Sequence, residues 1–394
     1  MNKINFLILL PILCGNLFAQ TFSDIQNEKT LEMFNALKID NKNLFISPLS
    51  IRLSLGIYYY GIKDEYHKEQ WEQYLGISDS ASKFAFNQIY DYSKHFSALI
   101  DAEMEKEKRS PIPKPSRVSN SKLEISNALK YQANMPLDSN YLIFLKDSLN
   151  VVLFPFEECD SQVNTKINSW VLKNSNNRIQ YSPEKDENAI INLIYFLGTW
   201  EYTFDKKDTK KRTFFTNNKI IRIETMYKKN PFSSYEDKKF HAVKLPYASC
   251  NMSVIILCPK NKRTSLNELD MDYWKYITNN LGGFYNIKLY LPKFSYSSSL
   301  IFDSDFWEQQ GITDDYSSNQ ELYIGTILQD TFIEMDEEKT EAWFITSAYR
   351  IGGRAKSKIV KANKPFLFFI VDDTSDLILF IGKYVGLQKT GSVP

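Results

Sequence analysis

The sequence predicts a single α+β domain. Apolar residues recur at helical spacing up to residue 104, whereas later segments have the patterns of strands interleaved with helices. There is no internal repeat and no regular strand–helix–strand alternation, which argues against solenoid and doubly wound folds. No composition shift marks a linker near the midpoint, so residues 20–394 are predicted to fold as one unit.

The first part of the chain is predicted to be mainly helical. Helices are predicted at 23–41, 49–60, 66–75 and 81–104. A short strand at Asn43–Pro48 ends at its proline. The segment 105–121 contains many charges, serines and three prolines, which is typical of an exposed loop.

Strands dominate the remainder. They are predicted at 122–131, 188–196, at several places within 212–257, at 286–295 and at 327–336, with helices at 137–149 and 162–174. Asn188–Phe196 is a continuous apolar run, typical of a strand buried on both faces. The chain is predicted to close with a β-hairpin that turns at Asp373–Asp376.

Composition narrows the function classes. A chain of 394 residues that is 43% hydrophobic can bury a sizeable core. Its 48 Lys and Arg against 47 Asp and Glu leave a net charge of +1, which argues against a protein that mainly grips nucleic acid. Only three histidines are present, so few imidazole side chains are available to bind a metal or to act in catalysis. We expect no metal, no cofactor and no nucleic-acid partner.

The N-terminus has the pattern of a secretory signal. Lys3 precedes the apolar run Phe6–Cys14, which is too short to span a bilayer. Ala19 supplies a small residue before cleavage, so residues 1–19 are predicted to be a signal peptide. The mature protein is then expected to be secreted, extracellular and not membrane-bound. The alternative is a buried N-terminal strand.

The cysteines do not predict a disulfide. Cys159, Cys250 and Cys258 remain after the signal. The strand that follows the turn at Ser249–Asn251 would carry Cys258 about 20 Å from that turn, beyond disulfide reach. Asn251, in the same turn, opens an Asn-Met-Ser acceptor for N-glycosylation, although so short a motif also arises by chance.

Common catalytic motifs are absent. The sequence has no G-x-S-x-G, H-E-x-x-H, Walker or G-x-G-x-x-G pattern. Carboxylate pairs such as Glu337-Glu338 are typical of solvated turns, and no histidine is placed near Cys159. The chain is therefore predicted not to be an enzyme.

A long segment near the C-terminus is the most informative. About 25 residues separate the strand at 327–336 from the terminal hairpin, and loops of this length are usually functional or disordered. Two of the nine arginines, Arg350 and Arg354, lie there, and Arg354 follows two glycines. An exposed Gly-Gly-Arg-Ala sequence suits a trypsin-like protease, whose specificity pocket is acidic. The alternative is an ordinary basic loop.

Eight segments between residues 25 and 388 form a recognisable series. The first is NLFISPLSIRLSLGIYYYGIK, and the others are, in order, ISNALKYQ, KINSWVLKNSNNRI, INLIYFLGTWEYTFD, VKLPYASCNMSVIILCP, IKLYLPKF, QQGITDDYS and NKPFLFFIVDDTSDLILFIGK. The first segment resembles the N-(I/V)-F-F-S-P-x-S-I opening of the serpin family, and the others match blocks of that family in the same order. The resemblance implies a serpin fold with three β-sheets, eight or nine helices and an exposed reactive-centre loop at about 337–362.

The resemblance also implies an activity. In this family a protease attacks the loop as a substrate and forms an acyl-enzyme. The cleaved loop then inserts into the central sheet as an extra strand and distorts the protease. The chain is therefore expected to be a monomeric endopeptidase inhibitor that is consumed in the reaction.

Several residues match positions with family roles. Ser47, Ser50 and Asn192 match a polar cluster under the central sheet, the shutter, and Gln329 stands where the family usually has histidine. Glutamine both donates and accepts hydrogen bonds, so we expect the network to persist with a different pH response. Trp200 matches the tryptophan of the breach, the top of the sheet where insertion begins. The hinge of the loop is matched by Glu337, Glu338, Lys339, Thr340, Glu341, Ala342, Trp343, Phe344 and Ile345.

The hinge departs from the inhibitory pattern. Lys339 replaces the usual glycine, and the bulky Trp343–Ile345 replaces a run of small residues. In an inserted strand the buried face would carry small residues except at Phe344, which would cost about 1–3 kcal/mol by overpacking. Two functions stay open: suicide inhibition, or a non-inhibitory serpin that acts as a binding, carrier or signalling protein.

Two ways of counting along the chain give two positions for the reactive bond. Counting from the hinge threonine gives Gly353, whereas counting back from the block 363–366 gives Arg354. We favour the Arg354–Ala355 bond, since a guanidinium fits an acidic specificity pocket. The predicted target is a trypsin-like serine protease. The competing cleavage sites are Gly353, Arg350 and Lys356.

A sulfated polysaccharide is a further expected partner. The family often binds such polymers near the helix matching 81–104, and basic residues follow it at Lys106, Lys108, Arg109, Lys114 and Arg117. Glutamates interrupt this run, so a solvated loop is the alternative.

Overall fold

The structure is a computed structural model of the 394-residue chain. It describes residues 15–37, 39, 41–80, 83, 86, 105, 109, 122–157, 161–175, 177, 179, 188–248, 251–262, 264–267, 269–312, 326–337 and 357–386.

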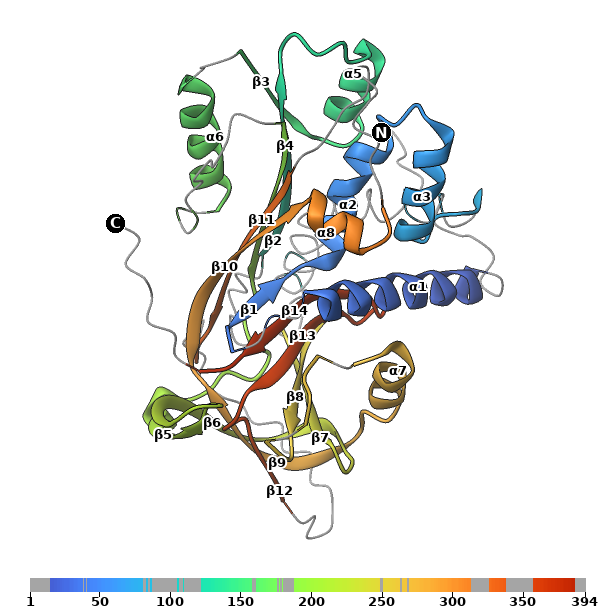
Figure 1. The fold of residues 1–394 in the computed structure, drawn as a ribbon. Helices are drawn as coiled ribbons and strands as arrows, with labels where there is room; N and C mark the ends of the chain where they lie inside the picture. The colour runs from blue at the N-terminus through green and yellow to red at the C-terminus, as the bar shows by residue number, and fades with distance from the viewer. Residues whose placement is uncertain are drawn as a thin grey trace.

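A five-stranded central sheet occupies the upper half of the molecule (Figure 1). Its strands, in spatial order, are β10 (Phe294–Asp303), β11 (Thr326–Met335), β4 (Ala189–Leu197), β2 (Lys122–Gln132) and β3 (Val152–Phe156). β11 runs parallel to β4 and β2 runs parallel to β3, whereas the other neighbours are antiparallel. The central sheet is therefore mixed.

A nine-stranded sheet forms the lower half (Figure 1). Its main path is β1 (Leu44–Ile46), β14 (Ile378–Tyr384), β13 (Phe366–Asp372), β8 (Met252–Pro259), β7 (Phe240–Pro246), β6 (Ile220–Glu236), β9 (Gly282–Pro292) and β12 (Lys358–Lys361), with β5 (Lys210–Phe215) paired to β6. β6 has 17 residues and pairs in turn with β5, β9 and β7.

The described helices surround and separate the sheets. They are α1 (Gly15–Ala36), α2 (Pro48–Tyr59), α3 (Glu65–Leu75), α5 (Ser139–Asp147), α6 (Ser161–Asn174), α7 (Met271–Asn279) and α8 (Ser304–Gln309), with one 3-10 turn, η1 (Lys206–Asp208). α2 contacts β4 of the central sheet and β14 of the lower sheet, and all its residues are buried. This helix is the layer between the two sheets.

The sequence-based assignment of an α+β fold is confirmed. The predicted strand at Asn43–Pro48, the helix after it and the buried strand Asn188–Phe196 are found as β1, α2 and β4. The terminal hairpin turns where expected, with Asp376 in the left-handed region at φ 59°. Continuous apolar runs bounded by proline or turn residues are strong local signals, which is why these elements were predictable.

Three structural details differ from the predictions. The described strands form two hydrogen-bonded sheets and not three, because the long β6 carries one ladder continuously into the next. Seven α-helices lie within the described residues and most of the predicted helix at 81–104 lies outside them, so the total of eight or nine helices stays a prediction. The predicted strand 286–295 is two strands, β9 and β10, which meet at Lys293. The helix predicted at 23–41 runs from Gly15 to Ala36, and no proline interrupts that stretch.

The loop boundary needs a further correction. Residues 358–361, predicted to belong to the loop at 337–362, form β12, which pairs parallel to β9. Its short sequence has a single fully buried residue, Val360, and so carries almost no periodic signal. The strand exists because β9 offers it a free edge, which is a long-range effect. Of residues 1–19, the predicted signal peptide, only 15–19 are described, as the start of α1.

The core is unusually aromatic where β1, β13 and β14 meet. Gly382 of β14 stands directly opposite Phe45 on one side and Phe368 on the other. The rings of Phe45 and Phe368 stack over it with centroids 5.9 Å apart. A Cβ at position 382 would overlap three carbon atoms of the Phe368 ring. Gly382 is therefore required by a close approach and not by its backbone angles.

Substituting Gly382→Ala is expected to lower the free energy of unfolding by about 1–3 kcal/mol, because the Phe368 ring has no free space to move into. Urea unfolding followed by circular dichroism measures the change. Gly282→Ala is the matched control, since a Cβ there meets only one backbone oxygen, at 3.9 Å. Equal losses in the two variants would contradict the packing argument.

Candidate functional site

A buried polar cluster lies where the N-terminus of α2 meets the central sheet. Asn192 Nδ2 donates to Ser50 Oγ at 2.8 Å, and Gln329 Nε2 donates to Asn192 Oδ1 at 2.9 Å. The Gln329 side chain also brackets the backbone of Ser47: its Oε1 accepts from the N–H and its Nε2 donates to the carbonyl, both at 3.1 Å. All four residues are at most 1% exposed. The structure thus brings together the four residues expected to form the shutter.

Two residues that sequence reasoning missed complete this cluster. Asn127 Oδ1 accepts from Asn192 Nδ2 and from Ser54 Oγ, each at 2.8 Å. Asn127 stands directly opposite Asn192 in the antiparallel β2–β4 pair. The available signal was a polar residue in the middle of a strand whose next two residues, Ala128 and Leu129, are wholly buried. A buried amide needs partners, so its position predicts a network.

Ser47 connects the cluster to the lower sheet. Its Oγ accepts from the Ser50 N–H at 3.2 Å, which makes Ser47 the N-cap of α2. The same hydroxyl donates to the carbonyl of Leu379 in β14 at 2.7 Å. Pro48 follows at the first helical position, where its missing N–H costs nothing. One serine therefore fixes the start of α2 and joins both sheets.

The shutter lies on the parallel junction between β4 and β11. Gln329 and Asn192 are directly opposite residues of this pair. The aligned ladder extends from Thr326 to Phe332 on β11, whereas β11 itself continues to Met335. The ladder therefore stops before the strand does, at the end of the sheet that leads into the long loop.

Trp200 covers that end of the junction. Its indole is 4% exposed, and its Nε1 donates to the carbonyl of Asp336 at 2.9 Å. The ring stacks on Tyr247 with centroids 4.9 Å apart and an interplanar angle of 12°. Trp200 thus lies just beyond the last residue of β11, and its role in the breach stays a prediction.

Glu337 anchors the chain as it leaves the sheet. Its carboxylate is 2.7 Å from Lys293 Nζ, and its carbonyl accepts from the N–H of Phe204 at 3.3 Å. Burial raises the pKa of Glu337, but the hydrogen bonds to its carboxylate and the positive charge of Lys293 together outweigh burial, so the net pKa is lowered. Predicted to be the first hinge residue, Glu337 is 3% exposed. It is the fixed point from which the hinge starts.

The rest of the hinge and the reactive bond lie outside the described residues. They comprise Glu338, Lys339, Thr340, Glu341, Ala342, Trp343, Phe344, Ile345, Arg350, Gly353, Arg354, Ala355 and Lys356. Of the basic residues proposed for polysaccharide binding, Arg109 is described and exposed, and Lys106, Lys108, Lys114 and Arg117 lie outside.

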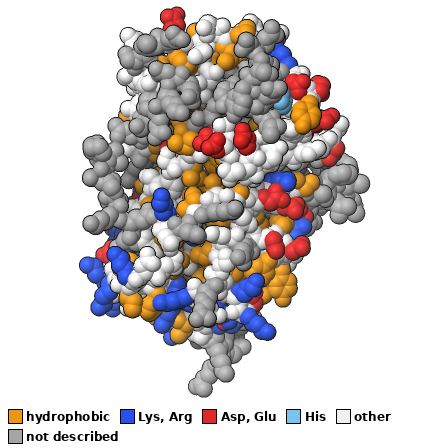
Figure 2. Space-filling model, in the orientation of Figure 1, with side chains coloured by type: hydrophobic (Ala, Val, Ile, Leu, Met, Phe, Trp, Pro, Cys, Tyr) orange, Lys and Arg blue, Asp and Glu red, His pale blue; other side chains and the backbone are white. Residues whose placement is uncertain are grey.

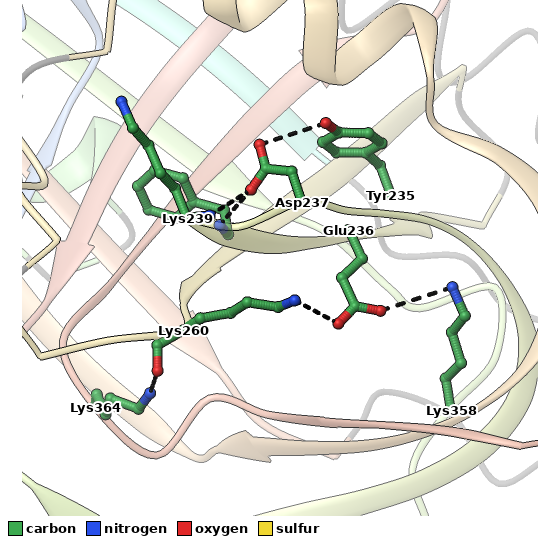
Figure 3. Close-up of polar contacts among 8 residues, drawn as sticks. Tyr235, Glu236, Asp237, Lys239, Lys260, Lys358 and Lys364 are labelled. Carbon is green, nitrogen blue, oxygen red and sulfur yellow. Dashed lines mark hydrogen bonds and ion pairs between the residues drawn. The ribbon is translucent and has the colours of Figure 1, made fainter.

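The far end of the loop is held by a separate clamp (Figure 3). Lys358 at the start of β12 and Lys260 both approach the carboxylate of Glu236, at 3.8 Å and 2.7 Å. The hydrogen bond from Lys260 lowers the pKa of Glu236, and partial burial opposes it. Lys364, after β12, donates to the carbonyl of Pro259 at 2.9 Å. The start of β12 is thus tied to the end of β6, and the residue Lys364 after β12 is tied to the end of β8.

The predicted modification and thiol sites have different surroundings. Asn251 is exposed in the turn before β8, where its carbonyl accepts from the N–H of Asp373 at 2.7 Å. Cys258 is buried and forms no disulfide, and burial raises the pKa of its thiol to about 12. Cys159 and Cys250 lie outside the described residues. Among described residues no cluster of His, Cys, Asp and Glu has metal-binding geometry, and no described helix is long and apolar enough to cross a bilayer.

The comparison with known proteins decides the family. The family profile described as Serpin (serine protease inhibitor) matches residues 24–387. This chain is a serpin. Serpins are typically protease inhibitors and not enzymes.

Its relatives are distant and widely distributed. A serpin-like protein of Methanosarcina mazei is 28% identical over 369 residues, covering 87% of this chain and 81% of that protein. Serpin B10 of Rhinolophus ferrumequinum is 26% identical over 399 residues, covering 91% and 97%. Native tengpin, a thermophilic serpin, superposes with a TM-score of 0.75 at 25% identity, over 93% of this serpin and 95% of that chain. Uncleaved ovalbumin, 23% identical, has a TM-score of 0.74 over 93% and 100%, which shows the shared fold.

Residue 329 of this serpin is glutamine, whereas the family usually has a titratable histidine at this position of the shutter. A Gln329→His variant would place an imidazole in the cluster, where burial favours its neutral form and lowers its pKa. The unfolded chain then binds more protons below pH about 6.5, so stability is retained above that pH and lost as pH falls. We expect the variant to lose about 1 kcal/mol relative to wild type between pH 7.5 and 5.5.

Urea unfolding at the two pH values measures this. Gln73→His is the control, since residue 73 is exposed on α3. A pH dependence of the Gln329→His variant no larger than that of the control would show that the shutter does not sense protonation at this position.

Glu337→Gln is expected to lower the free energy of unfolding by about 1 kcal/mol at pH 7, because a neutral amide replaces the carboxylate that pairs with the Lys293 ammonium. The lowered folded-state pKa means that this contribution is present above the unfolded pKa and is lost as pH falls through the folded one. The difference in unfolding free energy between wild type and variant should therefore shrink below pH about 4.3. A difference that stays constant down to pH 3 would contradict the assignment.

Proposed function

We propose that this serpin is a secreted suicide inhibitor of a trypsin-like serine endopeptidase. The observation that carries the proposal is the parallel contact between β4 and β11, directly beside the loop that begins after Glu337. A chain that turns back from β11 would enter this contact antiparallel to both strands. Antiparallel neighbours pair at least as well as parallel ones, so insertion would replace one ladder by two.

Chain length is sufficient for such an insertion. β11 has ten residues, which span about 33 Å. The fifteen residues from Thr340 to Arg354 would span about 50 Å when extended. A loop cleaved after Arg354 is therefore long enough to run the whole length of the sheet.

The reaction leads to a trapped enzyme. The protease serine Oγ attacks the Arg354 carbonyl, an ester forms, and the peptide bond breaks to release the new amino terminus of Ala355. Cleavage separates the chain after Glu337 from the strand β12. The free segment can then insert while it carries the esterified protease, and the energy gained distorts the enzyme before water hydrolyses the ester.

Secretion, glycosylation and target remain parts of the proposal. The pattern of residues 1–19 supports secretion, and the exposed position of Asn251 supports its use as a glycosylation acceptor. Arg354 supports a protease with an acidic specificity pocket. A sulfated polysaccharide at 106–117 is a further proposed partner, for which native protease nexin-1, solved with heparin, offers a precedent at 20% identity.

One observation favours a second function. Lys339 and the bulky Trp343–Ile345 lie in the part of the loop that would insert first. Slow insertion gives water time to hydrolyse the ester, so the serpin would be cleaved as a substrate and act instead as a binding, carrier or signalling protein.

Mixing the secreted protein with trypsin at equal molarity should give a denaturing-gel band larger than either protein that survives boiling. The band reflects the ester to Arg354, so an Arg354→Ala variant should lose it, while Lys356→Ala should keep it. Clean cleavage with active trypsin left free would exclude inhibition of trypsin. If cleavage also leaves the melting temperature unchanged, the loop does not insert and the second function is the correct one.

A further inference from the structure

The outward surface of β6, β9 and β12 forms a distinct face. Alternate residues of these strands point inward, where Ile287, Leu289 and Leu291 are wholly buried and Val360 is 1% exposed. The alternate residues between them point outward. By register they form two rows across the three strands, Tyr227–Tyr290–Lys361 and Lys229–Lys288–Ile359. We call these six residues, together with Arg212 of β5, the cationic face.

Four cations of this face form no ion pair within the described part of the chain. They are Arg212, Lys229, Lys288 and Lys361. Lys229 stands directly opposite Lys288, an arrangement that destabilises an antiparallel pair. The nearby carboxylates are placed elsewhere: Glu236 contacts Lys260 and Lys358, and Glu224 stands opposite Lys211 on the β5–β6 ribbon. Among the residues that the structure describes, the charge of these four cations is therefore not compensated.

Aromatic and apolar groups lie between these cations. The Tyr227 and Tyr290 rings are 5.0 Å apart, and the Arg212 guanidinium lies 4.8 Å from the Tyr290 centroid. Ile359 is 55% exposed beside Lys288. Tyrosine and arginine are the residues that dominate protein–protein contacts, whereas a polyanion needs cations alone. The composition of the face favours a folded protein partner with acidic side chains.

The face adjoins the loop. Lys358, the first residue of β12, is four residues after Arg354, which allows a span of at most about 14 Å. A protease seated on Arg354 would therefore lie against the neighbouring surface of β12 and β9. Figure 2 shows Lys and Arg side chains gathered over the lower part of the molecule, where Figure 1 places β5, β6, β9 and β12.

We propose that the cationic face is a docking surface for an acidic patch on the target protease, beside that enzyme's active-site cleft. The proposal rests on the proposed function, since it takes the occupant of the loop to be a protease. Docking on this face would select among proteases that share the same preference for arginine. It acts mainly on the rate of association, because opposite surface charges steer the encounter.

The test uses two enzymes with the same specificity and opposite surface charge, anionic and cationic trypsin, each with its catalytic serine replaced so that docking is measured without cleavage. In 50 mM salt the wild-type serpin should associate with anionic trypsin about tenfold faster than does the triple variant Lys229→Gln, Lys288→Gln, Lys361→Gln. This difference should disappear at 1 M salt, where charges are screened beyond about 3 Å. Cationic trypsin should show no such loss.

The matched control removes three exposed lysines at the other end of the molecule, as Lys146→Gln, Lys166→Gln, Lys173→Gln on α5 and α6. It should associate as the wild type does. Equal rates for the two triple variants would overturn the proposal. So would a face triple variant that loses retention on immobilised heparin while associating normally with anionic trypsin, since the face would then bind a polyanion.

The test of the cationic face and the test of the proposed inhibitory function can fail independently. Active trypsin that forms no boiling-resistant complex with wild type refutes inhibition of trypsin, yet the docking rates of the inactive enzymes still test the face. Complex formation at rates that do not depend on the three lysines refutes only the face.

Discussion

The parallel contact between β4 and β11 is the constraint on which the rest of the structure depends. Its middle residues, Asn192 and Gln329, are buried amides that bond to each other and to the start of α2. A satisfied buried hydrogen bond contributes only about 1 kcal/mol, but a broken one leaves a desolvated group that costs more. Opening the contact between β4 and β11 would leave these buried polar groups without hydrogen-bond partners. This penalty helps to keep the two strands together. A segment entering the junction must supply new backbone partners as it displaces old ones.

The two ends of the loop are fixed by separate contacts. Lys293 and Trp200 hold the residues after β11, while Glu236 holds Lys358 at the start of β12. In the proposed inhibitory mechanism β12 stays paired to β9, and cleavage of the loop would let the segment after Glu337 move independently of β12. The two contacts are consistent with that proposal.

Local patterns in the sequence were sufficient to predict elements and insufficient to predict partners. β4 is a continuous apolar run and α2 begins at Ser47-Pro48, so both follow from neighbouring residues alone. β12 has no such pattern, because it exists only through the free edge of β9. Asn127 belongs to the shutter through a register with Asn192, 65 residues away, and the sequence alone does not give that register. The resemblance to serpins supplied Ser47, Ser50, Asn192 and Gln329, because it carries long-range information that periodicity lacks.

The local grouping of charges on the surface was even harder to predict from the sequence than the pairing of strands. A net charge of +1 argued against a protein that mainly binds nucleic acid, and that inference concerns the molecule as a whole. Yet Lys229, Lys288 and Lys361 come from three segments that only the register of β6, β9 and β12 brings into adjacent positions. Fields at a surface depend on charges within a Debye length of about 10 Å, and not on the total. A protein can therefore be neutral overall and still present an unbalanced cationic face beside the loop that a protease would occupy, because strand pairing, and not composition, decides which charges are neighbours.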